Sequence, residues 1–252
     1  MEKRIIYGIN PVREAIRSEA KFERLLISSK RSASTKESAM DGLIKDARTR
    51  GIRVEPVDRA ELKSISGTEN NQGIVGVMSE GLAKYALEDI IEAWKASKEN
   101  GFILILDSIE DPQNMGTLIR SAEAAGVHGI IIPKDRSARI TATVSKASAG
   151  AIEHVRIHIA TNINNAIRKL KEAGAWVIAL EGEGESSITD VDLDTDIALI
   201  IGSEGKGIRR LVKENSDICA HIIMSGKTNS LNAAQAGTIA LFEARRQRSL
   251  KK

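Results

Sequence analysis

The sequence has few of the features that would place a protein outside the cytoplasm. It contains a single cysteine, Cys219, so no disulfide can form within the chain. Its longest apolar runs, such as residues 102–106 and 197–201, are far too short to span a membrane. No apolar core of a signal peptide follows the first residues. These absences predict a cytoplasmic protein that does not enter a membrane.

Aromatic side chains are also scarce, at 3% of the residues. A protein that recognises single-stranded nucleic acid by base stacking needs exposed aromatic side chains, and this chain has too few to supply such a surface. If RNA is the partner, contacts to the RNA backbone and shape should dominate. The four histidines have no metal-ligand spacing with Cys219, so we predict no metal site.

Charge is present but unevenly distributed along the chain, whose formal net charge is +3. Residues 181–196 carry seven acidic side chains and no basic one, whereas residues 205–252 carry ten basic and three acidic ones. This grouping fits one basic face that binds phosphates, and it equally fits several solvated surfaces of different sign.

Apolar patterning divides the chain into two domains. Residues 1–78 alternate short strands with a helical stretch, which predicts a small α/β domain, and residues 79–86 are the expected linker. Residues 87–252 predict an α/β fold with a mostly parallel sheet and helices on both faces. The strands expected in the second domain lie at 102–107, 129–132, 155–160, 176–181, 197–201 and 220–224. Its helices are expected at 87–98 and near 115–125, 141–150, 162–173, 207–215 and 231–248.

Ligands of such sheets bind in loops beyond the carboxyl ends of the strands, and three of these loops carry polar side chains. The first follows the strand at 102–107. Asn114 stands where a helix is expected to start, and Arg120 lies off the apolar stripe of that helix. Either Asn114 is an ordinary helix cap with Arg120 in solvent, or both side chains face a bound ribose or phosphate.

The second loop contains Gly202, Gly205 and Gly207 between a buried strand and a helix. Glycine allows the backbone to approach a ligand closely. The spacing differs from the dinucleotide-binding fingerprint, and Ile208 and Arg209 stand where a Walker A motif has lysine and serine or threonine. The loop is therefore either a flexible turn or a ligand-binding segment of another kind.

The third loop contains a Gly-Lys-Thr sequence at residues 226–228, which is typical of phosphate-binding loops. However, His221 occupies the position of the first glycine in that motif, so the motif is incomplete. Ser230 or Asn232 would serve as an ordinary cap for the C-terminal helix. Capping explains one of these two side chains but not both.

Taken in this order, the three segments resemble the signature motifs of SPOUT-class, trefoil-knotted RNA 2′-O-ribose methyltransferases, the TrmH-like family. Residues 114–122 resemble motif one, residues 202–207 motif two, and Met224 with residues 230–232 motif three. The resemblance covers nearly all of residues 102–248.

The rest of the chain is similar to one branch of this family, bacterial enzymes that methylate a guanosine ribose in large-subunit (23S) ribosomal RNA. Residues 6–10, 72–74 and 133–138 carry this similarity. In that branch the N-terminal domain binds RNA and the enzymes are homodimers. The chain departs from the family pattern with Ile223 in place of proline, Ala233-Ala234 in place of valine and serine, and Asn71 in place of histidine.

The resemblance implies methyl transfer from S-adenosylmethionine to a ribose 2′-hydroxyl of RNA, and a trefoil knot in the C-terminal domain. It implies a cofactor site formed by Ile201, Gly202, Ile222, Met224 and Leu231. It implies a catalytic cluster formed by Asn114, Arg120, Glu204, Ser230 and Asn232. Because arginine is effectively always protonated, we expect Arg120 to place the RNA and stabilise the developing alkoxide. Glu204 or an RNA phosphate would then accept the proton.

Three other functions stay open at this point. The substrate of the same reaction could be transfer RNA, although the additional N-terminal domain favours ribosomal RNA. The departures at residues 223 and 233–234 would suit a non-catalytic RNA-binding or ribosome-assembly protein that keeps the fold. A nucleotide hydrolase is suggested only by residues 226–228, in an incomplete motif.

Overall fold

The computed structural model describes residues 4–29, 35–226 and 230–250, so Lys227 and Thr228 of the Gly-Lys-Thr sequence lie outside the described residues. The chain forms two compact units. The first consists of Met1–Leu82 and Arg139–His154, and the second of Ala83–Ala138 and Val155–Lys252. None of the described helices is long and apolar enough to cross a membrane.

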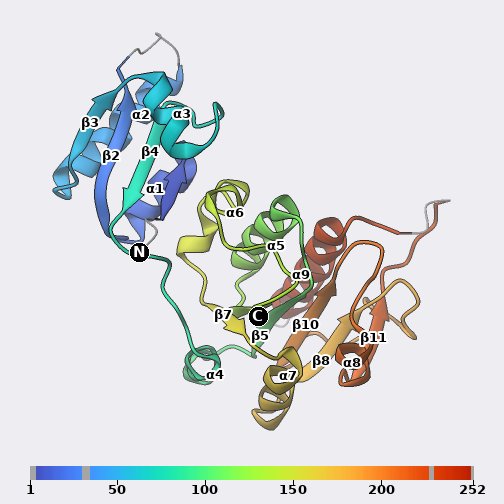
Figure 1. Cartoon of the computed structure of the whole chain (residues 1–252). Coiled ribbons are helices and arrows are strands. Elements are labelled where there is room, and N and C mark those ends of the chain that lie inside the picture. The colour runs from blue at the N-terminus through green and yellow to red at the C-terminus, as the bar shows by residue number, and fades with distance from the viewer. Residues whose placement is uncertain (1–3, 30–34, 227–229, 251–252) are drawn as a thin grey trace. The chain divides into compact units, whose positions relative to one another are not determined.

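The first unit is built on a mixed sheet with the strand order β1-β4-β2-β3 (Figure 1). β4 pairs antiparallel with β1 and β2, whereas β3 pairs parallel with β2. Because side chains alternate between the faces of a strand, Leu25 and Ile27 pack with α1 and α2, and Leu26 packs with Leu62 of α3. The elements are β1 (Ile5–Tyr7), α1 (Ile9–Arg17), β2 (Phe22–Ser28), α2 (Thr35–Thr49), β3 (Val54–Val57), α3 (Arg59–Ser66) and β4 (Ile74–Met78).

Residues 139–154 join the first unit although they follow a strand of the second. They form α6 (Ala142–Ala147) and the short 3-10 helix η1 (Ala151–Glu153). Glu153 forms an ion pair with Arg4, and His154 Nε2 lies 3.0 Å from Glu14 Oε2. The sequence places this segment inside the domain predicted at residues 87–252, whereas in the structure it packs with the first unit. Its partners are more than 70 residues away in sequence, so local patterning does not reveal which sheet the segment packs on.

The second unit contains a seven-stranded sheet with the order β7-β6-β5-β10-β8-β11-β9, and all of its strand pairs are parallel. The predicted parallel α/β fold of this region is therefore confirmed. Its strands are β5 (Phe102–Asp107), β6 (Gly129–Pro133), β7 (Ile157–Ala160), β8 (Trp176–Leu180), β9 (Ser186–Ser187), β10 (Ile197–Gly202) and β11 (Ile218–His221). Its helices are α4 (Leu87–Ala96), α5 (Pro112–Ala125), α7 (Ile163–Glu172), α8 (Arg210–Glu214) and α9 (Ala233–Leu250).

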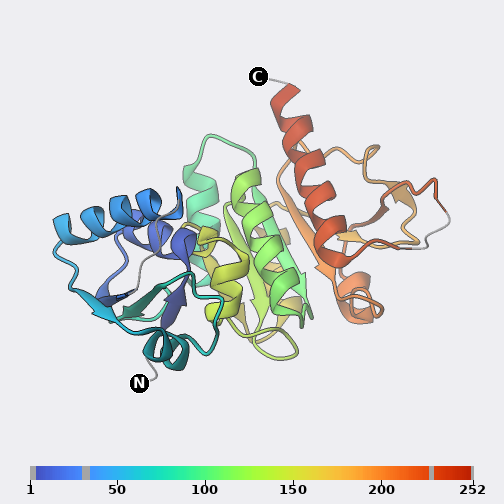
Figure 2. The ribbon, with the colours of Figure 1, turned by 90° about the horizontal axis from the view of Figure 1, so that it is seen from above.

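Helices cover both faces of this sheet. The buried faces of α4, α7 and α8 share one apolar cluster with Ile103 and Ile105 of β5. On the other face α5 and α9 pack against each other, as Figure 2 shows. Their close approach depends on Gly237, since a Cβ atom there would lie 2.4 Å from the Leu118 side chain. The start of α9 is thereby brought beside α5.

Two boundaries differ from the predictions in ways that affect the loops. β11 ends at His221, whereas the predicted strand ran to Met224, because the residues after His221 leave the sheet. α8 begins at Arg210 and not near residue 207, because Gly207 folds back to pair with Ser203. Both differences lengthen the loops at the carboxyl ends of the strands.

Candidate active site

The three sequence segments meet at the carboxyl-end edge of the second unit's sheet. β5 and β10 are neighbours in parallel register, with Asp107 opposite Gly202, so the loops that follow them start side by side. Asn114 Nδ2 donates a hydrogen bond to Glu204 Oε1 at 2.8 Å. Asn232 Nδ2 donates to Asn114 Oδ1 at 3.1 Å and also to Glu204 Oε1. In sequence, Asn114 is 90 positions from Glu204 and 118 positions from Asn232. Residues that are far apart in the chain therefore form one polar cluster.

Asn114 is free to join this cluster because another residue caps its helix. Asp111 accepts the backbone N–H groups of Gln113 and Asn114, at 3.3 and 3.1 Å, and Pro112 occupies the first helical position. Proline suits that position because its missing N–H would lack a helical partner there. The interpretation of Asn114 as an ordinary cap is thus wrong.

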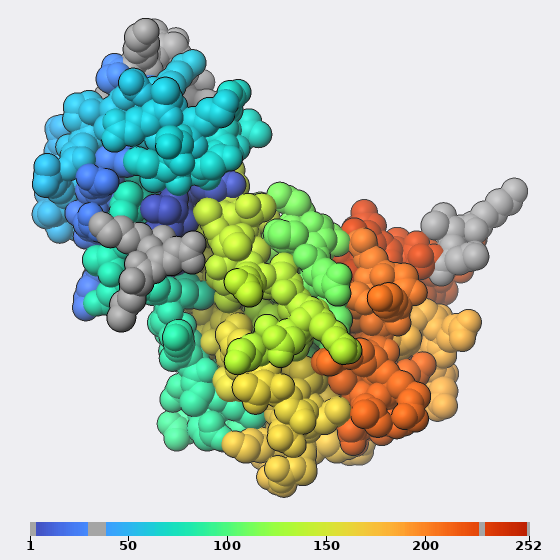
Figure 3. Space-filling model, in the orientation of Figure 1, coloured from blue at the N-terminus to red at the C-terminus, as the bar shows by residue number. Residues whose placement is uncertain are grey.

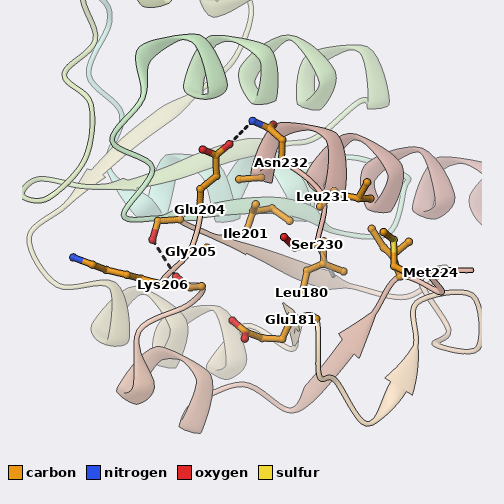
Figure 4. Close-up of a pocket in the computed structure, with 17 residues that line it drawn as sticks. Leu180, Glu181, Ile201, Glu204, Gly205, Lys206, Met224, Ser230, Leu231 and Asn232 are labelled. Atoms are coloured by element: carbon orange, nitrogen blue, oxygen red, sulfur yellow. Dashed lines mark hydrogen bonds between the residues drawn. The ribbon is translucent and has the colours of Figure 1, made fainter. Parts of the chain in front are cut away.

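Asn232 caps α9 and joins the cluster at the same time. Its Oδ1 accepts the backbone N–H of Ala234 at 2.8 Å and that of Gln235 at 3.3 Å. Its Nδ2 group points to Glu204, as Figure 4 shows. An asparagine side chain supplies both an acceptor and donors, so the capping and ligand-facing interpretations of this residue are compatible.

The glycine loop is a closed turn. Ser203 and Gly207 exchange backbone hydrogen bonds of 3.1 and 2.9 Å. A Cβ atom at Gly202 would lie 2.3 Å from the Gly207 backbone, so the absence of a side chain at Gly202 allows the loop to close on itself. The turn leaves Glu204, Gly205 and Lys206 exposed at its tip.

Two carboxylates outside the three motifs hold this loop in place. Asp107 is fully buried and accepts two hydrogen bonds from Arg209, one from the backbone N–H at 2.9 Å and one from the side-chain Nε–H at 2.7 Å. Glu181 accepts the backbone N–H of Ile208 at 2.8 Å. The motifs did not predict either acid. Each lies at or just after the end of a strand, which is the only signal that the sequence offers for them.

A cavity of about 670 Å³ opens beside the polar cluster (Figure 4). This volume is in the range of small-molecule sites. Leu180, Ile201 and Leu231 give the cavity an apolar lining, and Glu181 and Ser230 add polar groups. All five predicted cofactor residues line it: Ile201, Gly202, Ile222, Met224 and Leu231. Among the described residues, no group of three or more histidine, cysteine, aspartate or glutamate side chains could hold a metal ion.

Arg120 is the predicted catalytic residue that the structure does not bring into the cluster. It is exposed, it does not line the cavity, and its side chain has no partner among the described residues. It follows Asn114 by six positions, which places it about 120° away around the helix. Ser230 lines the cavity, but its side chain forms no hydrogen bond within the described part of the chain.

Comparisons with known proteins agree with this geometry. A model of the SpoU rRNA Methylase family matches residues 101–242, and one described as RNA 2′-O ribose methyltransferase substrate binding matches residues 5–80. The chain is 37% identical over 245 residues to a putative TrmH family tRNA/rRNA methyltransferase, YacO, of Bacillus subtilis, covering 97% of this chain and 96% of that protein. It is also 37% identical to the 23S rRNA (guanosine-2′-O-)-methyltransferase RlmB of Xanthomonas campestris, covering 96% of both proteins.

Solved structures show the same fold. The AdoMet-bound rRNA methyltransferase from Sinorhizobium meliloti superimposes with a TM-score of 0.76 at 25% sequence identity, covering 97% of this chain and 87% of that one. The family model matches more than half of the chain, and relatives at 37% identity match almost its whole length. The chain therefore belongs to the SpoU rRNA methylase family.

Proposed function

We propose that this protein transfers a methyl group from S-adenosylmethionine to the 2′-hydroxyl of a guanosine ribose in large-subunit ribosomal RNA, in the cytoplasm. The observation that carries the proposal is the Asn114–Glu204–Asn232 cluster at the rim of a cavity of suitable size. The similarity to the Xanthomonas campestris enzyme supports guanosine in 23S rRNA as the target.

The cavity residues fit S-adenosylmethionine, which supplies a methyl group activated by its positive sulfonium. The apolar side chains of Leu180, Ile201 and Leu231 would pack against the apolar parts of the cofactor, and the backbone around Gly202 and Ile222 would hydrogen-bond its polar groups. Ile223, which stands in place of the family's proline, is 64% exposed and does not line the cavity. The departure at this position therefore removes no cavity side chain.

Glu204 is our candidate for the proton acceptor. Both amide groups donate to its Oε1, which leaves Oε2 without a protein partner among the described residues and available to a ribose hydroxyl. Glu204 would take the proton of the 2′-hydroxyl as its oxygen bonds to the methyl group. Bound S-adenosylmethionine would supply that methyl group and keep the electron pair of the broken carbon–sulfur bond on its sulfur. Orientation of the two reactants can contribute about 7–11 kcal/mol in favourable cases.

Arg120 is our candidate for an RNA-binding group and not for a base. Its guanidinium stays protonated, and nothing in the described part of the chain neutralises it. A phosphate or a developing alkoxide is the partner that such a group would take. Ser230, whose hydroxyl lies in the cavity in Figure 4, is our candidate for a contact to the cofactor or the ribose.

We further propose that the protein is a homodimer with a trefoil knot in its second unit. Ile239 and Phe242 of α9 are 44% and 46% exposed, and two large apolar side chains one turn apart suit a subunit interface. The knot is supported by the likeness to the SpoU fold. Sedimentation analysis tests the dimer, and Phe242→Asp should shift it to monomers. Pulling on the chain ends tests the knot, because a knotted chain reaches a shorter full extension.

The central experiment is methyl transfer from labelled S-adenosylmethionine to total RNA, followed by mapping of the modified nucleotide. We expect label on a guanosine 2′-oxygen of 23S rRNA. Label on a base would overturn the 2′-O assignment, and label on transfer RNA would favour the alternative substrate. Failure to bind millimolar S-adenosylmethionine by calorimetry would favour a non-catalytic RNA-binding protein.

A further inference from the structure

The loop that follows β6 carries two cationic side chains that the catalytic cluster does not use. Lys134 and Arg136 are exposed, and neither side chain has a hydrogen-bond or ion-pair partner among the described residues. Two cations that follow β10 in the same unit are paired. Arg209 binds Asp107, and Arg210 binds Glu214.

This loop is fixed at both ends. The backbone N–H of Lys134 donates to the carbonyl of Ala160 at the end of β7, at 2.8 Å. The backbone N–H of Ala138 donates to the carbonyl of Ile109 at 2.8 Å, and the Ser137 hydroxyl donates to the same carbonyl at 3.2 Å. The loop therefore presents its two cations from a defined position.

Ile109 places the loop beside the chemistry. It is a buried residue of the segment that joins β5 to α5, five positions before Asn114. A loop that hydrogen-bonds to this segment lies at the same edge of the sheet as the polar cluster. Figure 3 shows the lime-green segment after β6 and the orange segment after β10 on one face of the molecule.

Two other cations of this unit are also unpaired. Lys206 follows β10 and Arg120 lies on α5, and like Lys134 and Arg136 after β6 their side chains are without partners in the described residues. A polyanion that spans several nucleotides satisfies such charges, because each phosphate that is bound releases condensed counterions. Of these four residues Lys206 lines the cavity and the other three do not, so a cofactor that fills the cavity leaves Arg120, Lys134 and Arg136 to another ligand.

We propose that Lys134 and Arg136 bind phosphates of the RNA that flank the acceptor nucleotide, and thereby hold its ribose at the Asn114–Glu204–Asn232 cluster. This inference rests on the proposed function and adds a substrate site within the methyltransferase unit, apart from the N-terminal unit. The two residues act on RNA binding and not on the methyl transfer step itself.

The test compares the full-length double variant Lys134→Ala/Arg136→Ala with a matched control, Lys98→Ala/Arg156→Ala. The control removes two exposed cations, also without ion-pair partners in the described part of the chain, from the amino-end edge of the same sheet. The probes are a 20-nucleotide RNA of mixed sequence for binding and an unmodified large-subunit rRNA transcript for turnover. Each protein is assayed from 50 to 200 mM salt.

We expect the loop variant to raise the KM for RNA about tenfold at low salt while kcat changes less than about twofold, because the two cations bind RNA phosphates and not the reacting atoms. The slope of log affinity against log salt should fall by roughly 0.7–0.9 for each phosphate that the variant no longer binds. The control should match the wild type. Lys134→Arg/Arg136→Lys should retain most of the affinity, because phosphates accept either cation. An unchanged affinity for S-adenosylmethionine shows that the variant is folded.

The inference is overturned if the wild type methylates RNA and the loop variant binds RNA with the control's affinity and salt slope. It is also overturned if kcat falls while the KM for RNA is unchanged. The proposed function fails in a different way, when the wild type transfers no methyl group to an RNA 2′-oxygen. Asp135→Asn tests the same inference in the opposite direction. Removal of the acidic side chain between the two cations should tighten RNA binding.

Discussion

The two edges of the second unit's sheet satisfy their polar groups in opposite ways. At the amino-end edge, Asp196 Oδ1 accepts both the Trp94 indole N–H and the backbone N–H of Gly101. Arg248 donates to the backbone carbonyls of Leu193, Thr195 and residues 100–101. At the carboxyl-end edge, Glu204 and Asn232 of the polar cluster are exposed, and Glu204 Oε2 has no partner within the described residues. One edge uses its polar groups to hold the fold, and the other leaves them available to ligands.

The largest effect that we expect is on kcat, from a substitution at the carboxyl-end edge. Glu204→Gln should lower kcat about 100- to 1,000-fold, because an amide cannot accept the ribose proton. The affinity for S-adenosylmethionine should change little. Labelled methyl transfer under saturating RNA measures kcat, and Glu214→Gln is the control, since Glu214 pairs with Arg210 on the surface. Full turnover in the Glu204 variant would remove this residue from the chemistry.

The next largest effect that we expect is on stability, from a substitution at the amino-end edge. Arg248→Ala should lower the free energy of unfolding by about 3 kcal/mol, because several backbone carbonyls lose a charged donor together. Arg245→Ala is the matched control and should cost less than about 0.5 kcal/mol. Urea unfolding measures both. If both variants lose equal stability, the difference between the edges does not lie in Arg248.

Asp107 and Arg209 form an ion pair at the carboxyl-end edge, so they test whether a paired group there stabilises the fold as the paired groups of the amino-end edge do. Arg209→Ala should cost about 2 kcal/mol of stability, since it leaves the buried Asp107 carboxylate with a backbone N–H and the Ser108 hydroxyl but no cation. It should also weaken S-adenosylmethionine binding, because the glycine loop loses an anchor. The double variant Asp107→Asn/Arg209→Ala should be more stable than Arg209→Ala alone. Additive losses in urea unfolding would contradict this coupling.

The smallest expected effect is a pH dependence at the amino-end edge. Burial lowers the pKa of His128 below its ordinary value, and its Nδ1 accepts the backbone N–H of Phe102 at 3.1 Å. Below about pH 6.5 the unfolded chain binds the proton more readily than the folded one, so stability falls as the pH falls. His128→Asn should flatten this dependence in urea unfolding between pH 5.5 and 8. An unchanged pH profile would assign the effect to other groups.

The parallel sheet was predictable because its central strands are continuous apolar runs, as in β5 and β10. The helix α1 was not predicted, since it is short and contains Pro11 near its start. The end of β11 was misplaced because Ile222 continues the apolar run but lines the cavity. Apolar composition does not distinguish a strand from a ligand-facing segment.

The sequence predicted part of the candidate site and missed part of it. The resemblance selected Asn114, Glu204 and Asn232, which the structure brings together, and their catalytic roles stay predictions. Asp107 and Arg209 were missed because they lie 102 positions apart and belong to no motif. Arg248 lies in none of the three motifs. Its four carbonyl acceptors come from segments that only the folded chain brings to the end of α9.

The placement of residues 139–154 in the first unit has a consequence for how this protein can be divided. A cut after Leu82 does not release two intact parts, because α6 and η1 would stay on the other fragment. The N-terminal fragment would lose the partner of Arg4 and the neighbour of Gln72. Deletion or exchange of the first unit therefore has to include both segments of the chain, and a gene fusion at one boundary alone would separate residues that fold together.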